Sequence, residues 1–308
     1  MNTITLYHWD QHYINKLIDQ FQCTLPQHHI VPWSKAISAD YLITWKPVDK
    51  IFLTKGLKVV FALGAGIDAF LQSKTLNENI PIVRLEEAGM GKQMLEIALY
   101  AILHYSRDMI TLNRGQRNKQ WLTEATPKRL PFSTKVGILG LGQLGGFVAT
   151  HLARLGYAVS GYSYSLKSLP GVNCYDKNQL TAFLADSEVL INLLPLTNET
   201  AHCLNKTLFA RLPTGAYLVN IARGGHLVEE DLIPALDNGQ LSGAFLDVFK
   251  QEPLPETHPF WSDDRITITP HLAAITLQDE AIRQISRNII AFEDNQPMTG
   301  VVDRYKGY

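Results

Sequence analysis

The chain of 308 residues is poor in cysteine, in net charge and in long apolar runs. Its three cysteines lie far apart, with neither a CxxC pair nor a zinc-ligand spacing, which excludes a disulfide scaffold and fits a reducing, cytoplasmic compartment. A net charge of −1 offers no basic field for nucleic acid. No apolar run reaches the roughly 18–20 residues that span a bilayer, and no signal peptide opens the chain. We therefore expect a cytoplasmic protein that binds neither nucleic acid nor membrane and holds no metal.

Residues 135–146, KVGILGLGQLGG, place a glycine-rich turn between an apolar run and a helical pattern. This arrangement predicts the strand, turn and helix of a dinucleotide-binding βαβ unit. Gly140 would permit the tight turn, Gly142 the approach of a pyrophosphate, and Gly145 the close packing of helix on strand. The N–H groups at the helix start would also bind phosphate oxygens. The predicted contacts are Gly140, Gly142, Gln143, Leu144 and Gly145.

Short apolar runs alternate with helical patterns along the whole chain, which predicts an α/β fold. Those at 3–9, 41–45, 59–63 and 82–85 precede the glycine turn. Six more predict a Rossmann-type, doubly wound parallel sheet over residues 92–271. They lie at 135–139, 157–161, 189–194, 216–221, 243–248 and 266–268.

Two segments between these units have their own patterns. Residues 90–114 predict one long helix, which either bridges domains or packs against a partner subunit. Residues 113–130 are polar and rich in lysine and arginine, and they predict an exposed, solvated arm.

The turn after the second strand contains hydroxyl groups where an acidic residue is usual. In NAD-binding proteins a carboxylate about 20 positions past the glycines holds the adenosine ribose. Here no acidic residue follows the glycine turn before Asp176. A carboxylate would repel a 2′-phosphate, whereas Ser163, Ser165 and Lys167 can donate hydrogen bonds to it. The predicted cofactor is NADP(H), with NAD(H) as the alternative.

Four polar residues follow later strands, at the edge where an open α/β sheet presents its ligand crevice. Arg223 can bind a carboxylate and polarise a carbonyl group, or it is a surface arginine. Asp247 can bind a nicotinamide carboxamide, or it caps a turn. His271 can donate a proton, or it is structural. Glu252 alone is an ordinary surface glutamate.

Taken in order, these motifs resemble those of the D-isomer-specific 2-hydroxyacid dehydrogenases. In that family the catalytic arginine, glutamate and histidine stand in N-x-x-R-G, D-V-F-x-x-E-P and T-P-H segments, which implies Arg223, Glu252 and His271 here. Residues 64–68, GAGID, resemble the family's substrate-carboxylate loop. Two tryptophans could wall the substrate pocket or pack in the core. The substrate-binding residues are then Trp45, Ala65, Gly66, Arg223 and Trp261.

The resemblance also implies the domain organisation and further cofactor contacts. The substrate domain would be a discontinuous, flavodoxin-like α/β unit of residues 1–91 and 272–308. The dinucleotide-binding domain, residues 92–271, would form a homodimer. Residues 84–91 and 301–308 resemble the A-type glyoxylate/hydroxypyruvate reductases, which commonly have an arginine at the position of Tyr164. The further implied cofactor contacts are Ser163, Tyr164, Lys167, Leu194, Pro195, Ile221, Ala222, Asp247 and Ala273.

The implied reaction is reduction of glyoxylate to glycolate, or of hydroxypyruvate to D-glycerate, by NADPH. Arg223 and the N–H groups of Ala65 and Gly66 would bind the substrate carboxylate. His271 would give its proton to the developing alkoxide, and Glu252 would orient the imidazole and favour its charged form. A reductase for another 2-oxo acid, such as pyruvate or phenylpyruvate, is one alternative. A nucleotide-sensing regulator on the same fold is the other.

Overall fold

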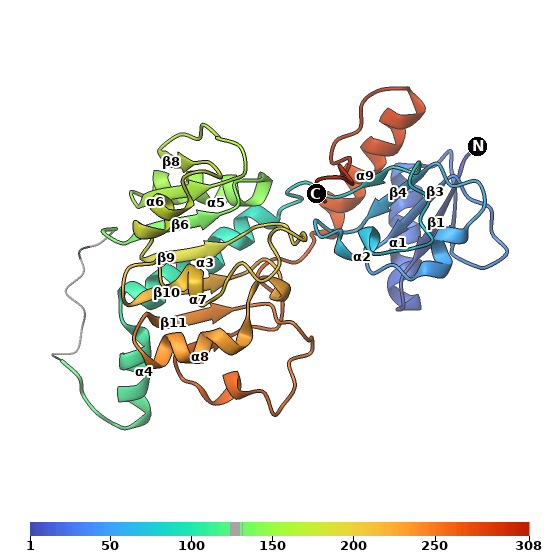
Figure 1. Cartoon of the computed structure of the whole chain (residues 1–308). Coiled ribbons are helices and arrows are strands. Elements are labelled where there is room, and N and C mark those ends of the chain that lie inside the picture. The colour runs from blue at the N-terminus through green and yellow to red at the C-terminus, as the bar shows by residue number, and fades with distance from the viewer. Residues whose placement is uncertain (124–129, 131, 308) are drawn as a thin grey trace. The chain divides into compact units, whose positions relative to one another are not determined.

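The computed structural model describes residues 1–123, 130 and 132–307 (Figure 1). The chain divides into two compact units, Met1–Gly89 with Thr276–Tyr308, and Met90–Ile275. Each unit contains a parallel sheet with helices, so the predicted α/β class is confirmed.

The larger unit is built on a parallel sheet that, within the described residues, has seven strands in the order β12-β11-β10-β9-β6-β7-β8. The strand order reverses between β6 and β9, so this sheet is doubly wound, as predicted. The sequence predicted only six strands, because the outermost strand, β8, has no fully buried residue and no apolar run. The strands are β6 (Lys135–Leu139), β7 (Ala158–Tyr162), β8 (Val172–Tyr175), β9 (Val189–Asn192), β10 (Ala216–Asn220), β11 (Leu241–Leu246) and β12 (Ile266–Ile268).

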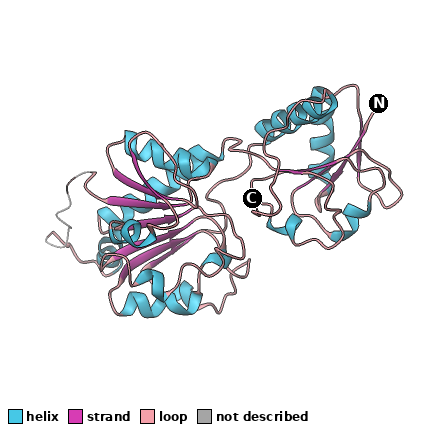
Figure 2. Ribbon diagram, turned by 45° about the horizontal axis from the view of Figure 1, so that its top comes forward, coloured by secondary structure: helices cyan, strands magenta, loops and turns pink. Residues whose placement is uncertain are grey.

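Helices cover both faces of this sheet (Figure 2). One face buries apolar side chains of α3 and α5 against the strands, and the other buries those of α6, α7 and α8. Burial of this kind contributes about 25 cal/mol for each Å² of apolar surface removed from water. The helices are α3 (Met90–Ser106), α4 (Met109–Arg117), α5 (Gln143–Arg154), α6 (Leu180–Ala185), α7 (Lys206–Phe209) and α8 (Glu229–Asp237), with short 3₁₀ turns at Gly224–His226 and Pro259–Ser262.

The prediction of one helix over residues 90–114 was wrong. Helix α3 ends at Ser106, and Asp108 takes a left-handed conformation with φ of 50° before α4 begins. Aspartate tolerates this conformation better than most residues, so neither glycine nor proline marks the break.

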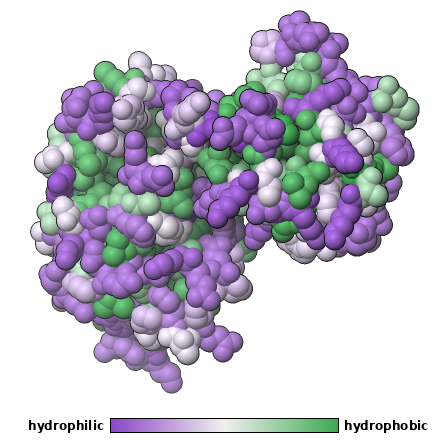
Figure 3. Space-filling model, turned by 45° about the vertical axis from the view of Figure 1, so that its right-hand side comes forward, coloured by the Kyte–Doolittle hydropathy of each residue, from purple (hydrophilic) through white to green (hydrophobic). Residues whose placement is uncertain are grey.

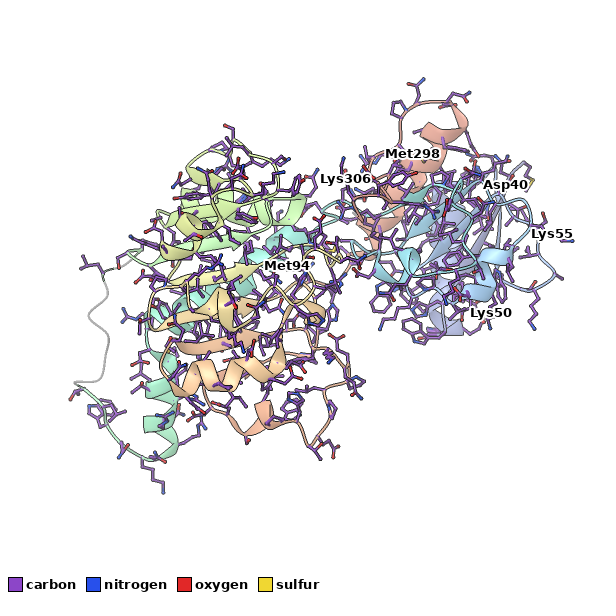
Figure 4. The ribbon with its side chains drawn as sticks, viewed as in Figure 1. Asp40, Lys50, Lys55, Met94, Met298 and Lys306 are labelled. Carbon is purple, nitrogen blue, oxygen red and sulfur yellow. The ribbon has the colours of Figure 1, made fainter. Side chains whose placement is uncertain are left out.

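Met94, on α3, is partly buried against the core of the larger unit and is labelled in Figure 4.

The predicted exposed arm over residues 113–130 was also wrong at its start, because α4 continues to Arg117. Arg114 makes a bidentate pair with Asp264, with Nε–Oδ2 and Nη2–Oδ1 distances of 3.0 and 2.8 Å. The arm's Lys128 and Arg129 lie outside the described residues.

The smaller unit has the strand order β2-β1-β3-β4-β5, the flavodoxin-like order that was predicted for it. Its strand β2 was not predicted, because its residues HIVP include one buried side chain and a terminal proline. The strands are β1 (Thr3–Tyr7), β2 (His29–Pro32), β3 (Tyr41–Thr44), β4 (Val59–Ala62) and β5 (Ile82–Val83). The helices are α1 (Gln11–Thr24), α2 (Asp68–Leu71) and α9 (Gln278–Glu293), with a 3₁₀ turn at Asp49–Leu53.

Both ends of the chain contribute to this smaller unit. Glu293, the last residue of α9, accepts hydrogen bonds from Asn2 Nδ2 at 2.6 Å and Tyr41 Oη at 3.1 Å, and its Oε1 lies 2.8 Å from His28 Nε2. Burial raises the pKa of Glu293, but these hydrogen bonds outweigh it and hold the pKa below its ordinary value. Val83 of β5 also forms an antiparallel bridge with Val301.

Hydrophilic side chains cover much of the molecular face in Figure 3, with separate apolar patches between them. In the part of the chain that the structure describes, no helix combines the length and the apolar character needed to cross a membrane.

Candidate active site

The glycine turn follows β6, and its three glycines meet different surroundings. Gly140 has φ of 98°, and a Cβ there would lie 2.8 Å from the carbonyl oxygen of Leu193. At Gly145 a Cβ would lie 1.8 Å from the carbonyl oxygen of Gly140. At Gly142, by contrast, an added Cβ meets nothing within 4 Å. The fold itself therefore requires Gly140 and Gly145, whereas the space at Gly142 is open for a ligand group.

Helix α5 starts directly after this open position. Gly142 is its N-cap and has no side chain to cap the first turn of the helix. The N-terminus of a helix of this length carries a partial positive charge and N–H donors that suit an anionic group. These residues fit the pyrophosphate of a dinucleotide, and Gln143 and Leu144 stand in this first turn.

Two buried asparagines link the neighbouring strand ends. Asn192 ends β9, and its Nδ2 donates to Asn220 Oδ1, at the end of β10, at 3.0 Å. Asn192 Oδ1 accepts from Leu194 N at 3.2 Å, and Asn220 Oδ1 accepts from Ala222 N at 3.3 Å. The pair thus fixes the loops that carry the predicted cofactor residues 194–195 and 221–222. This pair was not predicted from the sequence, although each asparagine closes an otherwise apolar strand.

Arg223 lies in the loop after β10, and buried groups shape its backbone. Its carbonyl oxygen accepts from Asn220 Nδ2 at 3.1 Å and lies 3.1 Å from His226 Nδ1. His226 is fully buried, and its Nε2 lies 3.2 Å from the carbonyl oxygen of Pro195. A Cβ at Gly224 would lie 1.9 Å from the carbonyl carbon of Phe249, so the loop packs against the segment after β11. His226, which was not predicted as a site residue, therefore connects the Arg223 loop to the Pro195 loop.

Asp247, directly after β11, is 1 % exposed and holds the segment that carries His271. Its Oδ1 accepts from Thr269 Oγ1 at 2.6 Å and from Leu272 N at 2.8 Å, and its Oδ2 accepts from Ala273 N at 2.9 Å. Its carbonyl oxygen accepts from His271 N at 2.8 Å. The structure therefore shows Asp247 as the anchor of this loop, which is the turn-capping role.

His271 and Glu252 form a direct pair, with His271 Nδ1 and Glu252 Oε2 separated by 2.7 Å. Their side chains are 46 % and 35 % exposed, so the pair is open to solvent in this unit. His271 has φ of 56°, a conformation that the bonds from Asp247 to its neighbours maintain. No described residue forms a hydrogen bond with Nε2, so this nitrogen is available to a ligand.

In the turn after β7, Ser163 N donates to the carbonyl oxygen of Tyr175 at 3.1 Å. The Ser163 hydroxyl donates its one proton to the carbonyl oxygen of Ser165 at 2.8 Å, so in this conformation it can only accept from a ligand. Tyr164 and Lys167 are exposed.

The other predicted substrate residues lie on loops of both units. In the smaller unit, Ala65 and Gly66 lie between β4 and α2, and a Cβ at Gly64 would lie 3.4 Å from the Trp45 ring. Trp45 is 45 % exposed, so the core alternative for this residue was wrong. In the larger unit, Trp261 is 53 % exposed, and its Nε1 donates to the carbonyl oxygen of Pro255 at 2.9 Å.

The larger unit thus contains the glycine turn together with Arg223, Asp247, Glu252 and His271. Among the described residues, no three His, Cys, Asp or Glu side chains are placed to hold a metal ion.

A family model described as the NAD binding domain of D-isomer specific 2-hydroxyacid dehydrogenases matches residues 99–273, more than half of the chain. The chain belongs to this family. The D-isomer-specific 2-hydroxyacid dehydrogenases are oxidoreductases, so the predictions of the family and of an enzyme are confirmed.

The chain is similar in sequence and in structure to several members of this family. Glyoxylate/hydroxypyruvate reductase A of Serratia proteamaculans is 46 % identical over 293 residues, 92 % of this chain and 93 % of that protein. The family member from Xanthobacter autotrophicus Py2 in complex with NADPH and MES is 36 % identical. It has a TM-score of 0.92, with 100 % of this chain and 99 % of that chain covered. The NADPH-dependent glyoxylate/hydroxypyruvate reductase of Sinorhizobium meliloti in complex with NADP and sulfate is 31 % identical. Its TM-score is 0.91, and both chains are covered fully.

Proposed function

We propose that this 2-hydroxyacid oxidoreductase reduces glyoxylate to glycolate and hydroxypyruvate to D-glycerate with NADPH. The observation that carries the proposal is the His271–Glu252 pair, with Nδ1 held at 2.7 Å and Nε2 available to a substrate. The similarity to glyoxylate/hydroxypyruvate reductase A over 92 % of the chain supports the choice of substrates.

Bound NADPH supplies the hydride. Arg223 binds the substrate carboxylate and polarises the ketone, because a guanidinium forms two parallel hydrogen bonds with a carboxylate. Protonated His271 gives the Nε2 proton to the developing alkoxide. Glu252 accepts from Nδ1–H, which orients the ring. On the smaller unit, the N–H groups of Ala65 and Gly66 are the proposed carboxylate contacts, and Trp45 is the proposed wall for the rest of the substrate.

The choice of NADPH over NADH rests on the turn after β7, which has no carboxylate to repel a 2′-phosphate. The similar structures from Xanthobacter autotrophicus and Sinorhizobium meliloti contain NADPH and NADP, which supports the same choice. We also propose a homodimer formed through the larger unit, because Tyr100 and Leu103 of α3 are 49 % and 48 % exposed.

The test is the loss of absorbance of NADPH and of NADH with glyoxylate, hydroxypyruvate, pyruvate and phenylpyruvate, each in parallel. We expect the highest kcat/KM with NADPH and the first two acids. A higher value with pyruvate or phenylpyruvate would assign another 2-oxo acid, and no turnover with any of the four would favour a nucleotide-sensing regulator.

Two variants separate chemistry from binding in the same assay. Arg223→Ala should raise KM for the oxo acid and lower kcat by about 100-fold or more, as the loss of a transition-state contact does. His271→Gln should lower kcat by about 100- to 10,000-fold and leave NADPH binding unchanged. An H271Q protein that no longer binds NADPH would instead show that the histidine is structural.

A further inference from the structure

Strands β7 and β8 bring together two residues that lie 13 positions apart in the sequence, Tyr164 and Lys177. The two strands are parallel, and Tyr162 pairs with Tyr175 at their carboxyl ends. Tyr164 and Lys177 each come two residues after this pair. Both side chains therefore start from the same edge of the sheet, next to the turn in which a dinucleotide's adenosine ribose is bound.

The ammonium group of Lys177 is held by the Tyr164 side chain. Lys177 Nζ lies 4.6 Å from the centroid of the Tyr164 ring, and it donates to Tyr164 Oη at 3.2 Å. A cation over an aromatic face is stabilised by the ring quadrupole, by about 0.5–1 kcal/mol at an exposed site. An ammonium has three N–H donors, so the bond to Tyr164 leaves others for a phosphate oxygen.

The position of this pair relative to the glycine turn is fixed by backbone hydrogen bonds. Gly140 N donates to the carbonyl oxygen of Tyr162 at 2.9 Å, which joins the end of β7 to the pyrophosphate cradle. Ser163 N donates to the carbonyl oxygen of Tyr175, which joins β7 to the end of β8. The glycine turn, the Tyr164 turn and Lys177 therefore follow one another along the edge of the sheet.

Among the polar groups near this turn, the lysines are the ones suited to bind a phosphate. The Ser163 hydroxyl proton is used within its own turn. Asp176, beside Lys177, accepts from Asn178 N through Oδ1 at 2.9 Å, so one of its oxygens is engaged at the start of the following segment. Lys167 is exposed in the turn itself and provides the second cation near this edge.

We propose that Lys177, held on the ring of Tyr164, is the cation that binds the 2′-phosphate of NADP(H) in this chain. Lysine binds phosphate as a point charge, and an ammonium already held in place loses less conformational entropy when the phosphate arrives. The proposal rests on the proposed preference for NADPH. It assigns that preference to Lys177, which follows β8, and not to an arginine in the turn after β7.

The test uses two probes that differ only in the 2′-phosphate, adenosine 2′,5′-bisphosphate and AMP, in calorimetric titrations of the full chain. We expect Lys177→Met to raise the Kd of the bisphosphate about tenfold and to leave the Kd of AMP unchanged. Tyr164→Leu should raise the Kd of the bisphosphate by a smaller factor, because the ammonium is retained but no longer held. Lys177→Arg should retain most of the affinity.

Two controls make the result specific. Lys206→Met removes an exposed lysine from another part of the same unit and should bind both probes as the unchanged chain does. Lys167→Met tests the other cation of the turn. Bisphosphate affinity that is unchanged in K177M, or lost only in K167M, would overturn the assignment and leave the NADPH preference standing. If the unchanged chain binds the bisphosphate no more tightly than AMP, the NADPH preference itself is wrong.

Discussion

Glu252 connects His271 to the backbone after β11 through its two carboxylate oxygens. Oε2 lies 2.7 Å from His271 Nδ1, and Oε1 accepts from Phe249 N at 3.1 Å. The carboxylate is therefore fixed by the main chain before it contacts the imidazole. The orientation of the ring depends on this bond as well as on the loop that carries His271.

Replacement of Glu252 by glutamine should lower kcat for reduction by about 10- to 100-fold. Glutamine keeps the length of the side chain but removes the charged acceptor that orients the imidazole through Nδ1. Initial rates of oxo-acid reduction measure the effect. Glu256→Gln, four residues away on the exposed surface, is the matched control and should leave kcat unchanged. An unchanged kcat in E252Q would mean that the loop alone orients the ring.

Alanine substitutions in the glycine turn should separate cofactor binding from folding. Gly142→Ala should change the free energy of unfolding by less than about 1 kcal/mol, because its Cβ enters open space. The same methyl group would occupy the pyrophosphate position, so the Kd of NADPH should rise about tenfold or more. Gly145→Ala should cost more than about 2 kcal/mol or prevent folding, because its Cβ meets the Gly140 carbonyl group.

Denaturant titrations and NADPH fluorescence measure these two quantities. Gly146→Ala is the control, since its Cβ would make only an ordinary contact with Leu169 at 3.7 Å. If G142A bound NADPH with unchanged affinity, the pyrophosphate would not lie against this glycine.

Loss of the Asp247 carboxylate should lower the free energy of unfolding more than loss of any one of its three hydrogen-bond donors. Asp247→Asn replaces one accepting oxygen with an NH₂ group that faces a donor, and it should cost about 2–3 kcal/mol of unfolding free energy. Thr269→Val removes one donor and leaves both backbone bonds, so it should cost about 1–1.5 kcal/mol. Urea titrations of the two variants provide the comparison. Equal losses would show that the loop is held mainly by other contacts.

His104 on α3 should make stability depend on pH. It is 6 % exposed, and burial lowers its pKa below the ordinary value, although the nearby Asp108 raises it in part. The unfolded chain therefore takes up the proton first as the pH falls, and stability present above about pH 6.5 is lost below it. Between pH 7.5 and 5.5 the melting temperature of the unchanged chain should fall further than that of the His104→Gln variant. The same loss in both proteins would remove His104 as the cause.

The sequence predicted the strands that form short continuous apolar runs and missed those that are stabilised mainly by pairing with a neighbouring strand. Strands β6, β9 and β10 were found because their residues are buried on both sides. The edge strand β8 and the short β2 depend on backbone pairing with one neighbour, which leaves no periodic signal. The helix break at Asp108 has no glycine or proline, so residue preferences alone could not locate it.

The same distinction applies to the candidate site. Arg223, Glu252 and His271 were proposed from motifs, and the structure shows the contact between the last two. His226 and Lys177 were missed because their partners, the Pro195 carbonyl group and the Tyr164 ring, lie far away in sequence. A lone histidine or lysine carries no information about its partner until the strand register is known.

The contacts of Glu293 with Asn2 and Tyr41 have a consequence for the order of synthesis. Asn2 and Glu293 are separated by 291 positions, so the smaller unit lacks α9 until the ribosome has released almost the whole chain. The residues between, Met90–Ile275, form their own compact unit and are complete earlier. Domains generally fold as units, from the N-terminus onward. Here residues 1–89 are translated before the middle unit but must wait until α9 has followed it, with the face of α1 and the Tyr41 ring that contact α9 uncovered.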